Sequence, residues 1–407
     1  MGLIDKIKSM VVARFGLQDM PPRVSGGRSD AGEIVTGSNV LGISAVWSCV
    51  NLLSGTIGSL PLQVYRQDGN ARKADPQHPL YRLLHDSPNY DQTAVDFWMF
   101  MAASIELWGN AYAAITRGEG RIIGLTPVSP ELVAVRRLSS GSLEYSWSDE
   151  GKAHVVTDMD MLHVRGFGGS PLGGMSVLQV ARNSFGLARA VDRAAGETFK
   201  NGMRPSGALK FDEFLSEENR ATARNELASQ FVGAVNTGRP MILEGGAEWV
   251  PFTINPDDAQ MLESRRFSVE EICRFFGVPP HMVGHTEKSS SWGTGLEQQT
   301  LGFQKFTLRP RIKRIEQALM KQLLTPKDRA AGLTIEFNIE GLLRADSAGR
   351  ATYYNTMTGI GAMTINEVRR LENLPPVPGG DVPRMQMQNV PITQAVNQLE
   401  AGNADDA

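Results

Sequence analysis

The sequence predicts an α+β protein made of several lobes. Its 407 residues suffice for two or three ordinary domains, and its 41% hydrophobic and 21% charged residues are typical of globular proteins. Helical and strand patterns alternate from residue 38 to residue 175. Beyond them, two long helical stretches bracket a mixed segment of roughly 50 residues. Together these observations indicate a mixed body attached to a pair of long helices.

The N-terminal part divides into a linker and a mixed lobe. Residues 1–37 hold a short amphipathic stretch and then a polar segment rich in Gly and Pro, which is typical of a linker. Residues 38–175 begin with helical spacing and then alternate as a strand does in "LPLQVYR". A helix is expected at "TAVDFWMFMAASIELWG", and further strands at "AYAAITR", "LVAVRRL", "LEYSWS" and "MLHVRGF".

Two long helices follow, with a small mixed segment between them. Residues 176–203 and residues 257–276 each predict a helix, and residues 204–256 combine one helix with two strands. Because the two helices bracket a small lobe, they can lie antiparallel as a stalk. A monomer has little with which to bury the apolar side of a stalk, so we expect neighbouring copies to cover it.

The remaining chain is mostly helical. A Gly- and Ser-rich segment lies within residues 277–295, and a third long helix is expected over residues 296–324. The strand "LTIEFNI" lies in residues 325–340, and short helices are expected over residues 341–382. Residues 383–407, rich in Met, Gln and Asn, read as a flexible tail.

Composition restricts the possible partners. The formal net charge of −3 gives no overall attraction for nucleic acid, so any DNA contact must be local. Cys49 and Cys273 lie far apart in sequence, which suits a reducing compartment and gives no disulfide framework. No apolar run approaches the roughly 18 residues of a membrane span, so we expect no contact with a membrane.

Five cations share one face of the first long helix. At about 100° and 1.5 Å per residue they fall within about 60° of arc over about 33 Å. Two interpretations stay open, a solvated basic face or a guide for a polyanion where copies of the helix line a channel. Asp192 and Glu197 lie beside this face and can pair with it. The residues of this basic stripe are Arg182, Arg189, Arg193, Lys200 and Arg204.

Several catalytic motifs are incomplete. In "GFGGSPLGG", Pro171 replaces the third glycine of a dinucleotide loop, and Leu172 stands where G-x-S-x-G needs its last glycine. No phosphate-binding G-x-x-x-x-G-K-[ST] motif occurs. His281 and His285 are four residues apart but belong to no H-E-x-x-H motif. We therefore expect no catalytic residue, no metal site and no cofactor.

The segment "GHTEKSSSWGTG", residues 284–295, is a candidate contact loop. Its Ser and Gly residues bend at little cost, its lysine offers a charge and its tryptophan offers a flat stacking surface. The alternative is a mobile linker whose tryptophan packs locally. The candidate residues are His285, Lys288, Ser289, Ser290, Ser291 and Trp292.

From about residue 40 to residue 382 the chain resembles a known family. The matching blocks include "AVWSCVNLLSGTIGSLPLQVYR", "HPLYRLLHDSPN", "LWGNAYAAITR", "FKNGMRPSGAL", "SVEEICRFFGVPPHMVG", "EQQTLGFQKFTLRPRIKRIEQAL" and "GAMTINEVRRLENLPPVPGGD". Each block is weakly specific, but their order along the chain resembles the short branch of the portal (head-to-tail connector) proteins of tailed double-stranded DNA bacteriophages.

The resemblance implies a portal fold assembled as a ring of twelve subunits around DNA at one capsid vertex. It assigns the parts as N-terminal arm 1–37, wing 38–175, first stem helix 176–203, clip 204–256, second stem helix 257–276, tunnel loop 277–295, crossing helix 296–324, wing return strand 325–340, crown 341–382 and tail 383–407.

The resemblance also implies partners. The terminase large subunit and later a head-completion adaptor protein would dock on the clip, and the major capsid protein and scaffold would contact the wing. Non-specific double-stranded DNA would pass through the channel of a virion particle assembled in the bacterial host cytoplasm. The charged clip helix is the expected docking surface, with an ordinary solvated helix as the alternative. Its residues are Glu217, Glu218, Arg220, Arg224 and Glu226.

Two other classes of function stay open. One is a ring-forming scaffold of a virus-like or gene-transfer particle that does not handle DNA directly. The other is a hydrolase that uses Ser170 or His163. For the portal we expect Arg182, Arg189 and Arg193 to face the channel or the groove between subunits.

Overall fold

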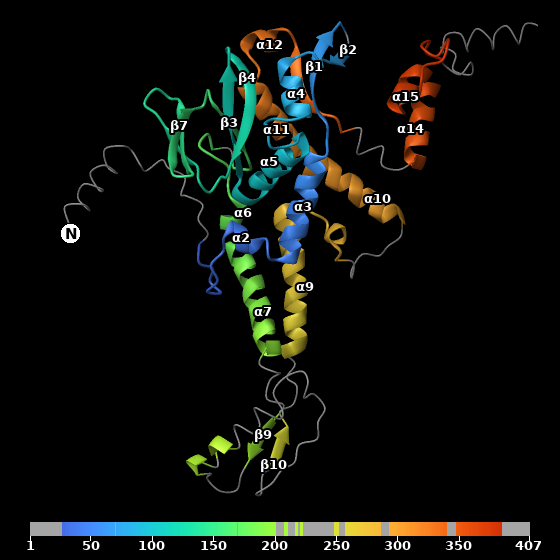
Figure 1. The fold of residues 1–407 in the computed structure, drawn as a ribbon. Helices are drawn as coiled ribbons and strands as arrows, with labels where there is room; N and C mark the ends of the chain where they lie inside the picture. The colour runs from blue at the N-terminus through green and yellow to red at the C-terminus, as the bar shows by residue number, and fades with distance from the viewer. Residues whose placement is uncertain are drawn as a thin grey trace, which may run out of the picture. The chain divides into compact units, whose positions relative to one another are not determined.

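The computed structural model describes residues 27–69, 71–168, 170–200, 207–210, 216–218, 220–222, 248–251, 257–285, 293–339 and 347–384. These residues form helices and short antiparallel sheets (Figure 1), so the predicted α+β class is confirmed. The chain divides into two compact units, residues 1–337 and residues 338–407. No helix among the described residues has the length and apolar character needed to cross a membrane.

Two closely packed helices lie in the first unit. They are α3 (Ser44–Gly58) and α5 (Ala94–Trp108). The approach is close because Gly58 has no side chain, and a Cβ there would lie 2.5 Å from Met99 Cγ of α5. Trp98 of α5 is buried, and its Nε1–H donates to the carbonyl of Leu84 at 3.0 Å.

The limits of α5 follow from its terminal residues. Thr93 and Asp96 form a capping box in which each side chain accepts from the other residue's backbone amide. Gly109 ends the helix with φ of 68°, a left-handed conformation that favours glycine. Two shorter helices of this region are α2 (Gly37–Val40) and α4 (Pro79–His85).

One sheet joins distant parts of the chain. Strand β1 (Leu62–Asp68) pairs antiparallel with β2 (Ala71–Ala74) on one side and with β11 (Leu333–Phe337) on the other. The pairing of Leu62 with Phe337 therefore returns the end of the first unit to its N-terminal part.

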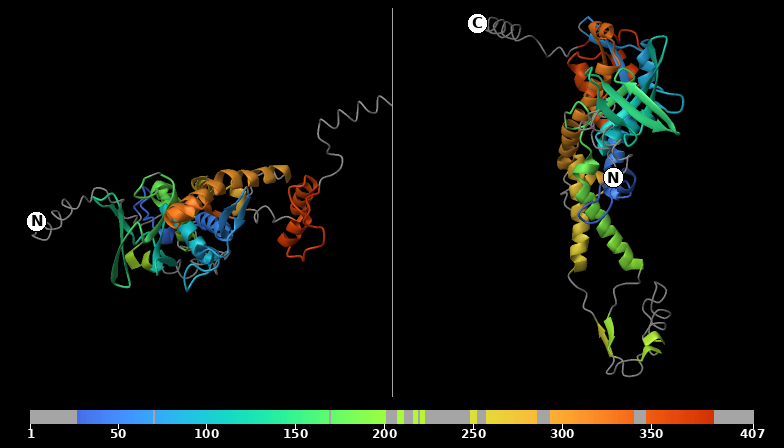
Figure 2. Two further views of the ribbon diagram at one scale, coloured as in Figure 1. Left: turned by 90° about the horizontal axis from the view of Figure 1, so that it is seen from above. Right: turned by 90° about the vertical axis from the view of Figure 1, so that its left-hand side faces the viewer.

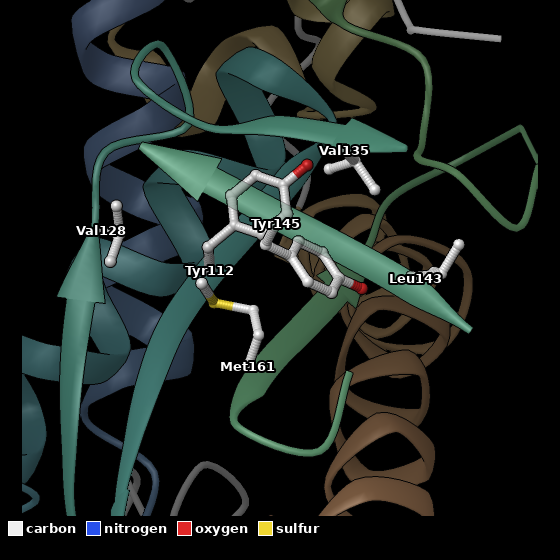
Figure 3. Close-up of a cluster of buried hydrophobic side chains, with 6 residues drawn as sticks. All are labelled: Tyr112, Val128, Val135, Leu143, Tyr145 and Met161. Atoms are coloured by element: carbon white, nitrogen blue, oxygen red, sulfur yellow. The ribbon is translucent and has the colours of Figure 1, made fainter. Parts of the chain in front are cut away.

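Two further sheets enclose an apolar cluster. In one, β3 (Asn110–Gly118) lies between β4 (Arg121–Val128) and β8 (Met161–Arg165). In the other, β6 (Leu143–Asp149) lies between β5 (Ala134–Arg137) and β7 (Lys152–Thr157). Side chains from both sheets meet in Figure 3, and they are Tyr112, Val128, Val135, Leu143, Tyr145 and Met161. Burial raises the pKa of Tyr145 to about 12.

A pair of long helices follows the sheets. A short α6 (Val177–Val180) leads into α7 (Arg182–Lys200), which lies beside α9 (Asp257–Phe276) in Figures 1 and 2. Phe185 of α7 and Phe276 of α9 are both fully buried, with ring centroids 6.4 Å apart. In the segment between α7 and α9, β9 (Gly207–Lys210) pairs antiparallel with β10 (Glu248–Pro251).

The two cysteines of the chain meet between α3 and α9. Cys49 and Cys273 are both buried, and their Sγ atoms lie 4.0 Å apart as free thiols. The contact with Cys273 and burial raise the pKa of the Cys49 thiol.

The third long helix changes its winding part of the way along. It consists of α10 (Gly293–Gly302), a π-helical turn (Phe303–Leu308) and α11 (Arg309–Gln322). Pro310 accounts for the change, because it has no N–H for the carbonyl four residues earlier and its ring crowds that carbonyl. A short α12 (Pro326–Ala330) then leads to β11.

The second unit contains a helix pair. The helices of its described residues are α14 (Ser347–Gly359) and α15 (Ile365–Leu371), the latter opened by a capping box of Thr364 and Glu367. The side chain of Asn366 is buried and binds both the N–H and the carbonyl of Val377.

Candidate nucleic-acid interface

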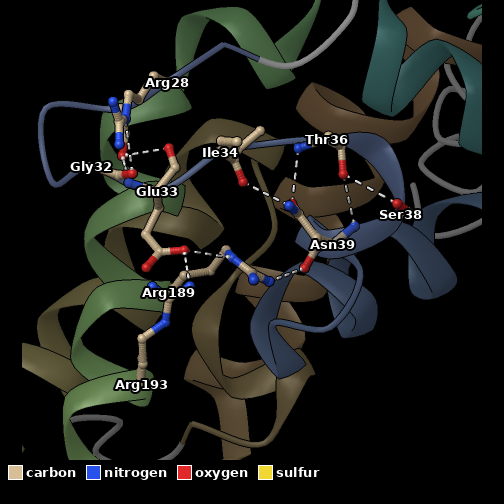
Figure 4. A network of polar contacts seen from close by, with 10 residues as sticks. Arg28, Gly32, Glu33, Ile34, Thr36, Ser38, Asn39, Arg189 and Arg193 are labelled. Atoms are coloured by element: carbon tan, nitrogen blue, oxygen red, sulfur yellow. Dashed lines mark hydrogen bonds and ion pairs between the residues drawn. The ribbon is translucent and has the colours of Figure 1, made fainter.

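The basic stripe on α7 is partly covered by the chain's own N-terminal segment. Arg193 Nη2 donates to Glu33 Oε2 at 2.8 Å, and Arg189 Nε lies 3.6 Å from the same oxygen (Figure 4). Arg189 Nη1 also donates to the backbone carbonyl of Asn39 at 2.8 Å. The Glu33 side chain is only 6% exposed, so two cations of the stripe contact the same buried carboxylate.

Of the other three residues of the stripe, two lie at the ends of α7 and one lies outside the described residues. Arg182 begins α7 and packs on Gly27, where a Cβ would lie 2.6 Å from Nη1. Lys200 ends α7, and Arg204 lies outside the described residues. That Arg182, Arg189 and Arg193 face the channel or the groove between subunits stays a prediction.

Sequence reasoning did not single out Glu33. It lies in the segment read as a linker, and its partners are more than 150 residues away. An acidic residue in a short polar segment rich in glycine carries no periodic signal. The ordered backbone contacts of residues 27–36 could be found only from the structure.

The candidate contact loop is described at its two ends. Gly284 has φ of 84° at the end of a 3₁₀ turn (Pro280–Val283), and His285 Nε2 lies 3.8 Å from Glu270 Oε1 of α9. His285 also lines a hollow of about 290 Å³ beside α3, α7 and α9. Helix α10 begins at Gly293. The remaining candidates lie outside the described residues, and they are Lys288, Ser289, Ser290, Ser291 and Trp292.

The contact between α9 and the third long helix is held by one arginine and one threonine. Arg311 donates to both carboxylate oxygens of Glu106, at 2.7 and 2.9 Å, and to the carbonyl of Phe276 at 2.9 Å. Thr307 Oγ1 donates to the carbonyl of Gly277 at 2.7 Å. These bonds join the end of α9 to the π-helical turn and to the start of α11.

The candidate docking helix is described as a short exposed turn. Glu217, Glu218 and Arg220 are exposed, and the amide of Arg220 donates to the carbonyl of Ser216 at 2.9 Å. Arg224 and Glu226 lie outside the described residues.

The hydrolase candidates do not form a reactive pair. His163 is fully buried, with Nε2 2.9 Å from Asn110 Oδ1 and Nδ1 3.2 Å from the Tyr145 hydroxyl. Burial holds the pKa of His163 well below its usual value. Ser170 is exposed, and its Oγ accepts from the amide of Leu172 at 3.2 Å. Both ring nitrogens of His163 are therefore used in structural hydrogen bonds.

Metal-binding side chains are dispersed in the part of the chain that the structure describes. No three His, Cys, Asp or Glu side chains gather there in a group that would hold a metal ion.

The fold defines the class of protein. The chain resembles a solved neck subunit of the native gene transfer agent particle, with a TM-score of 0.60 and 22% identity over 90% of this chain and 99% of that one. It also resembles a crystal structure of an HK97-family phage portal protein from Corynebacterium diphtheriae, with a TM-score of 0.55 and 21% identity over 77% and 98% of the two chains. The fold is that of portal subunits.

Sequence comparison then gives the family. The family described as phage portal protein matches residues 44–373. The portal protein of Enterobacteria phage HK97 is 38% identical over 97% of this chain and 93% of its own length. The probable portal protein of Streptomyces phage phiC31 is 32% identical over 86% and 78%. The chain belongs to the phage portal protein family, and the resemblance noted in the sequence is confirmed.

Proposed function

We propose that twelve copies of this chain form a ring at one capsid vertex and that double-stranded DNA passes through it during packaging and ejection. Family membership over most of the chain carries the proposal. Support for the ring comes from the similar neck structure of the gene transfer agent particle, which was computed with C12 symmetry. A closed ring needs two different complementary surfaces on each subunit.

Exposed apolar side chains support assembly of the chain with other copies. Large apolar side chains on or near the long helices are exposed, as expected for surfaces that neighbours cover. They include Trp47, Val180, Leu187, Phe267, Leu301 and Phe306.

We assign the parts of the subunit as follows. The sheets and helices of residues 38–175 with β11 form the wing, and α7 and α9 form the stem. The segment with β9 and β10 forms the clip, on which the terminase large subunit and then the head-completion adaptor protein dock. Capsid protein and scaffold contact the wing, and residues 341–382 form the crown. The particle is assembled in the bacterial cytoplasm, and the ring remains in the virion.

The charge of the chain suits a sliding channel. Each phosphate that a protein neutralises adds affinity through counterion release, so a strongly basic channel would hold DNA too tightly to let it slide. With a net charge of −3, the chain offers only local cations, including Lys288 of the candidate loop. These make weak contacts with phosphate that do not depend on base sequence.

Assembly is tested first. Native mass measurement and negative-stain imaging of the full-length protein should give a ring with a central hole wide enough for a DNA duplex. A compact monomer at working concentration contradicts the ring.

Deletion of residues 286–293 tests the role of the loop. We expect rings to form and particles to lose or poorly retain their DNA. A matched control replaces the same residues by an equally long Gly/Ser sequence, which separates loop length from Lys288 and Trp292 chemistry. Normal DNA-filled particles from the deletion would favour the alternative of a ring-forming scaffold without direct DNA handling.

A further inference from the structure

Residues 27–39 fold into a compact hairpin and a helical turn. The amide of Ser29 donates to the carbonyl of Glu33 at 2.8 Å, and the amide of Val35 donates to the carbonyl of Gly27 at 3.1 Å. Ser29 Oγ donates to the carbonyl of Glu33 at 3.0 Å and lies 3.2 Å from its amide nitrogen. Gly32, with φ of 80°, makes the turn possible. We name residues 27–39 the latch.

The latch is seated on α7 through a notch at Gly186. A Cβ at Gly186 would lie 2.0 Å from Ser29 Oγ and 2.2 Å from Ser29 Cβ, so no larger residue fits while the latch is in place. One turn earlier, Asn183 Nδ2 donates to Asp30 Oδ2 at 2.6 Å, and the amide of Asp30 donates to Asn183 Oδ1 at 3.2 Å. The contact therefore depends on shape as well as charge.

Glu33 occupies an anion site made by α7. Its Oε2 is the partner of Arg193 at 2.8 Å and of Arg189 at 3.6 Å, on successive turns of one helix face. The site is not saturated, because Arg189 Nε is buried and has no hydrogen-bond partner within the described part of the chain. Arg193 keeps 60% of its side chain exposed, so an outside anion can reach it.

We propose that the latch competes with DNA for this site, and that Arg189 and Arg193 bind backbone phosphate when Glu33 leaves. A phosphate offers more acceptor oxygens than Glu33 presents here, and the arginine head group suits it geometrically. While the latch is closed, Glu33 occupies Arg189 and Arg193, and the stem therefore attracts DNA only weakly. The choice of DNA as the ligand rests on the proposed portal function, whereas the contacts of the latch are observed within a single chain.

The test displaces the latch without changing any charge. Gly186→Ala places a methyl group where Ser29 lies and retains every ionisable group. Gly196→Ala is the matched control, because it makes the same change on the same helix where nothing lies within 4 Å. Both variants are made in the full-length chain. The rate of trypsin cleavage after Arg28 reports whether the latch is displaced. Binding of a short duplex DNA at several salt concentrations reports whether Arg189 and Arg193 bind phosphate.

We expect Gly186→Ala to speed cleavage after Arg28 several-fold and to tighten DNA binding. Two newly available cations should steepen the dependence of log Kd on log salt by up to about 1.8 per bound chain. Gly196→Ala should behave as wild type in both measurements. Adding Arg189→Gln and Arg193→Gln to Gly186→Ala should remove the gain in DNA binding and leave cleavage fast.

Several results would overturn the proposal. Unchanged cleavage in Gly186→Ala shows that there is no displaceable latch. Faster cleavage with an unchanged salt slope shows that the arginines are not a phosphate site, and an equal gain in Gly196→Ala shows that the effect is not local. If Gly186→Ala does not fold, Glu33→Gln carries the same expectation for DNA binding, and wild-type salt dependence in that variant overturns the site. Absence of rings in the wild type would count against the portal function, whereas rings with an unchanged salt slope in Gly186→Ala count against the latch alone.

Discussion

At the scale of single residues, burial decides what His163 does. The side-chain nitrogen Nδ2 of Asn110 donates to the backbone carbonyls of Trp108 and Gly174. Asn110 Oδ1 therefore accepts from His163 Nε2. His163 Nδ1 then accepts from the Tyr145 hydroxyl. This neutral tautomer satisfies every partner, and burial lowers the pKa of His163 because the charged ring would lose its hydration. His163, a candidate catalytic base in the sequence analysis, is a buried core residue in the fold.

Stability should therefore fall in mild acid. The unfolded chain takes up a proton on this histidine below its ordinary pKa of about 6.5, whereas the folded chain does not. The stabilisation present above about pH 6.5 is lost as the pH falls, with a limiting slope of about 1.4 kcal/mol per pH unit. Urea unfolding midpoints between about pH 7.5 and pH 5 should drop less steeply in His163→Gln than in wild type. Equal slopes would show that His163 does not cause the loss.

At the scale of elements, the junction of α9 with the third long helix depends on Thr307. Its hydroxyl bonds to the carbonyl of Gly277, next to the bond from Arg311 to Phe276. These bonds hold the end of α9 against the third long helix, on the body side of the candidate contact loop. The π-helical turn supplies the required placement of Thr307, and Pro310 explains why the turn occurs there.

Removing that hydroxyl should loosen the junction without unfolding the chain. Thr307→Val keeps the shape of the side chain and should cost about 1 kcal/mol, since one hydrogen bond is lost at a partly buried position. Thr307→Ser is the control, because it retains the hydroxyl. Hydrogen exchange of residues 277–285 should be faster in Thr307→Val than in Thr307→Ser. The same exchange rate in both variants would contradict a role for this bond.

Local patterns predicted much of this element structure, and contacts between distant residues account for the rest. A helix is expected at residues 257–276 and is described at Asp257–Phe276, because apolar spacing and the acidic start are local signals. The pairing of Leu62 with Phe337 depends on contacts between distant residues. The π-helical turn has a local signal in Pro310, which the expectation of one unbroken helix over residues 296–324 did not use. The break at Ala181 divides the single helix expected over residues 176–203 into α6 and α7. Helical periodicity likewise placed Arg189 and Arg193 on one face. It gave no sign of Glu33, because the partner belongs to a distant segment.

At the scale of the whole molecule, the two units differ in their cores. The first unit has a large apolar interior built from all three of its described three-stranded sheets and the long helices. Over residues 349–384 of the second unit, Asn366 and Gly380 are the buried residues, and apolar side chains such as Ile360 and Leu374 are exposed. The second unit has 70 residues, a size at which a single hydrophobic core supplies little stability and support from oligomerisation, metals or disulfides is common.

The second unit should therefore not fold by itself. A chain that ends after Phe337 should keep the cooperative thermal unfolding of the first unit, measured by circular dichroism. The separate segment 338–407 should show no cooperative transition, because no apolar side chain is buried over its described residues 349–384. A sharp transition in the isolated segment would contradict this reading of its burial.

The cysteine pair has a practical consequence. The chain has two cysteines, and both are buried in the contact between α3 and α9, where the contact with Cys273 and burial raise the pKa of the Cys49 thiol. A maleimide dye should therefore leave the native protein unlabelled and react at a newly introduced surface thiol, for example at the fully exposed Tyr90. Fluorophores can then be attached at chosen positions without first replacing the natural thiols, which permits distance measurements by energy transfer between labelled copies of the chain.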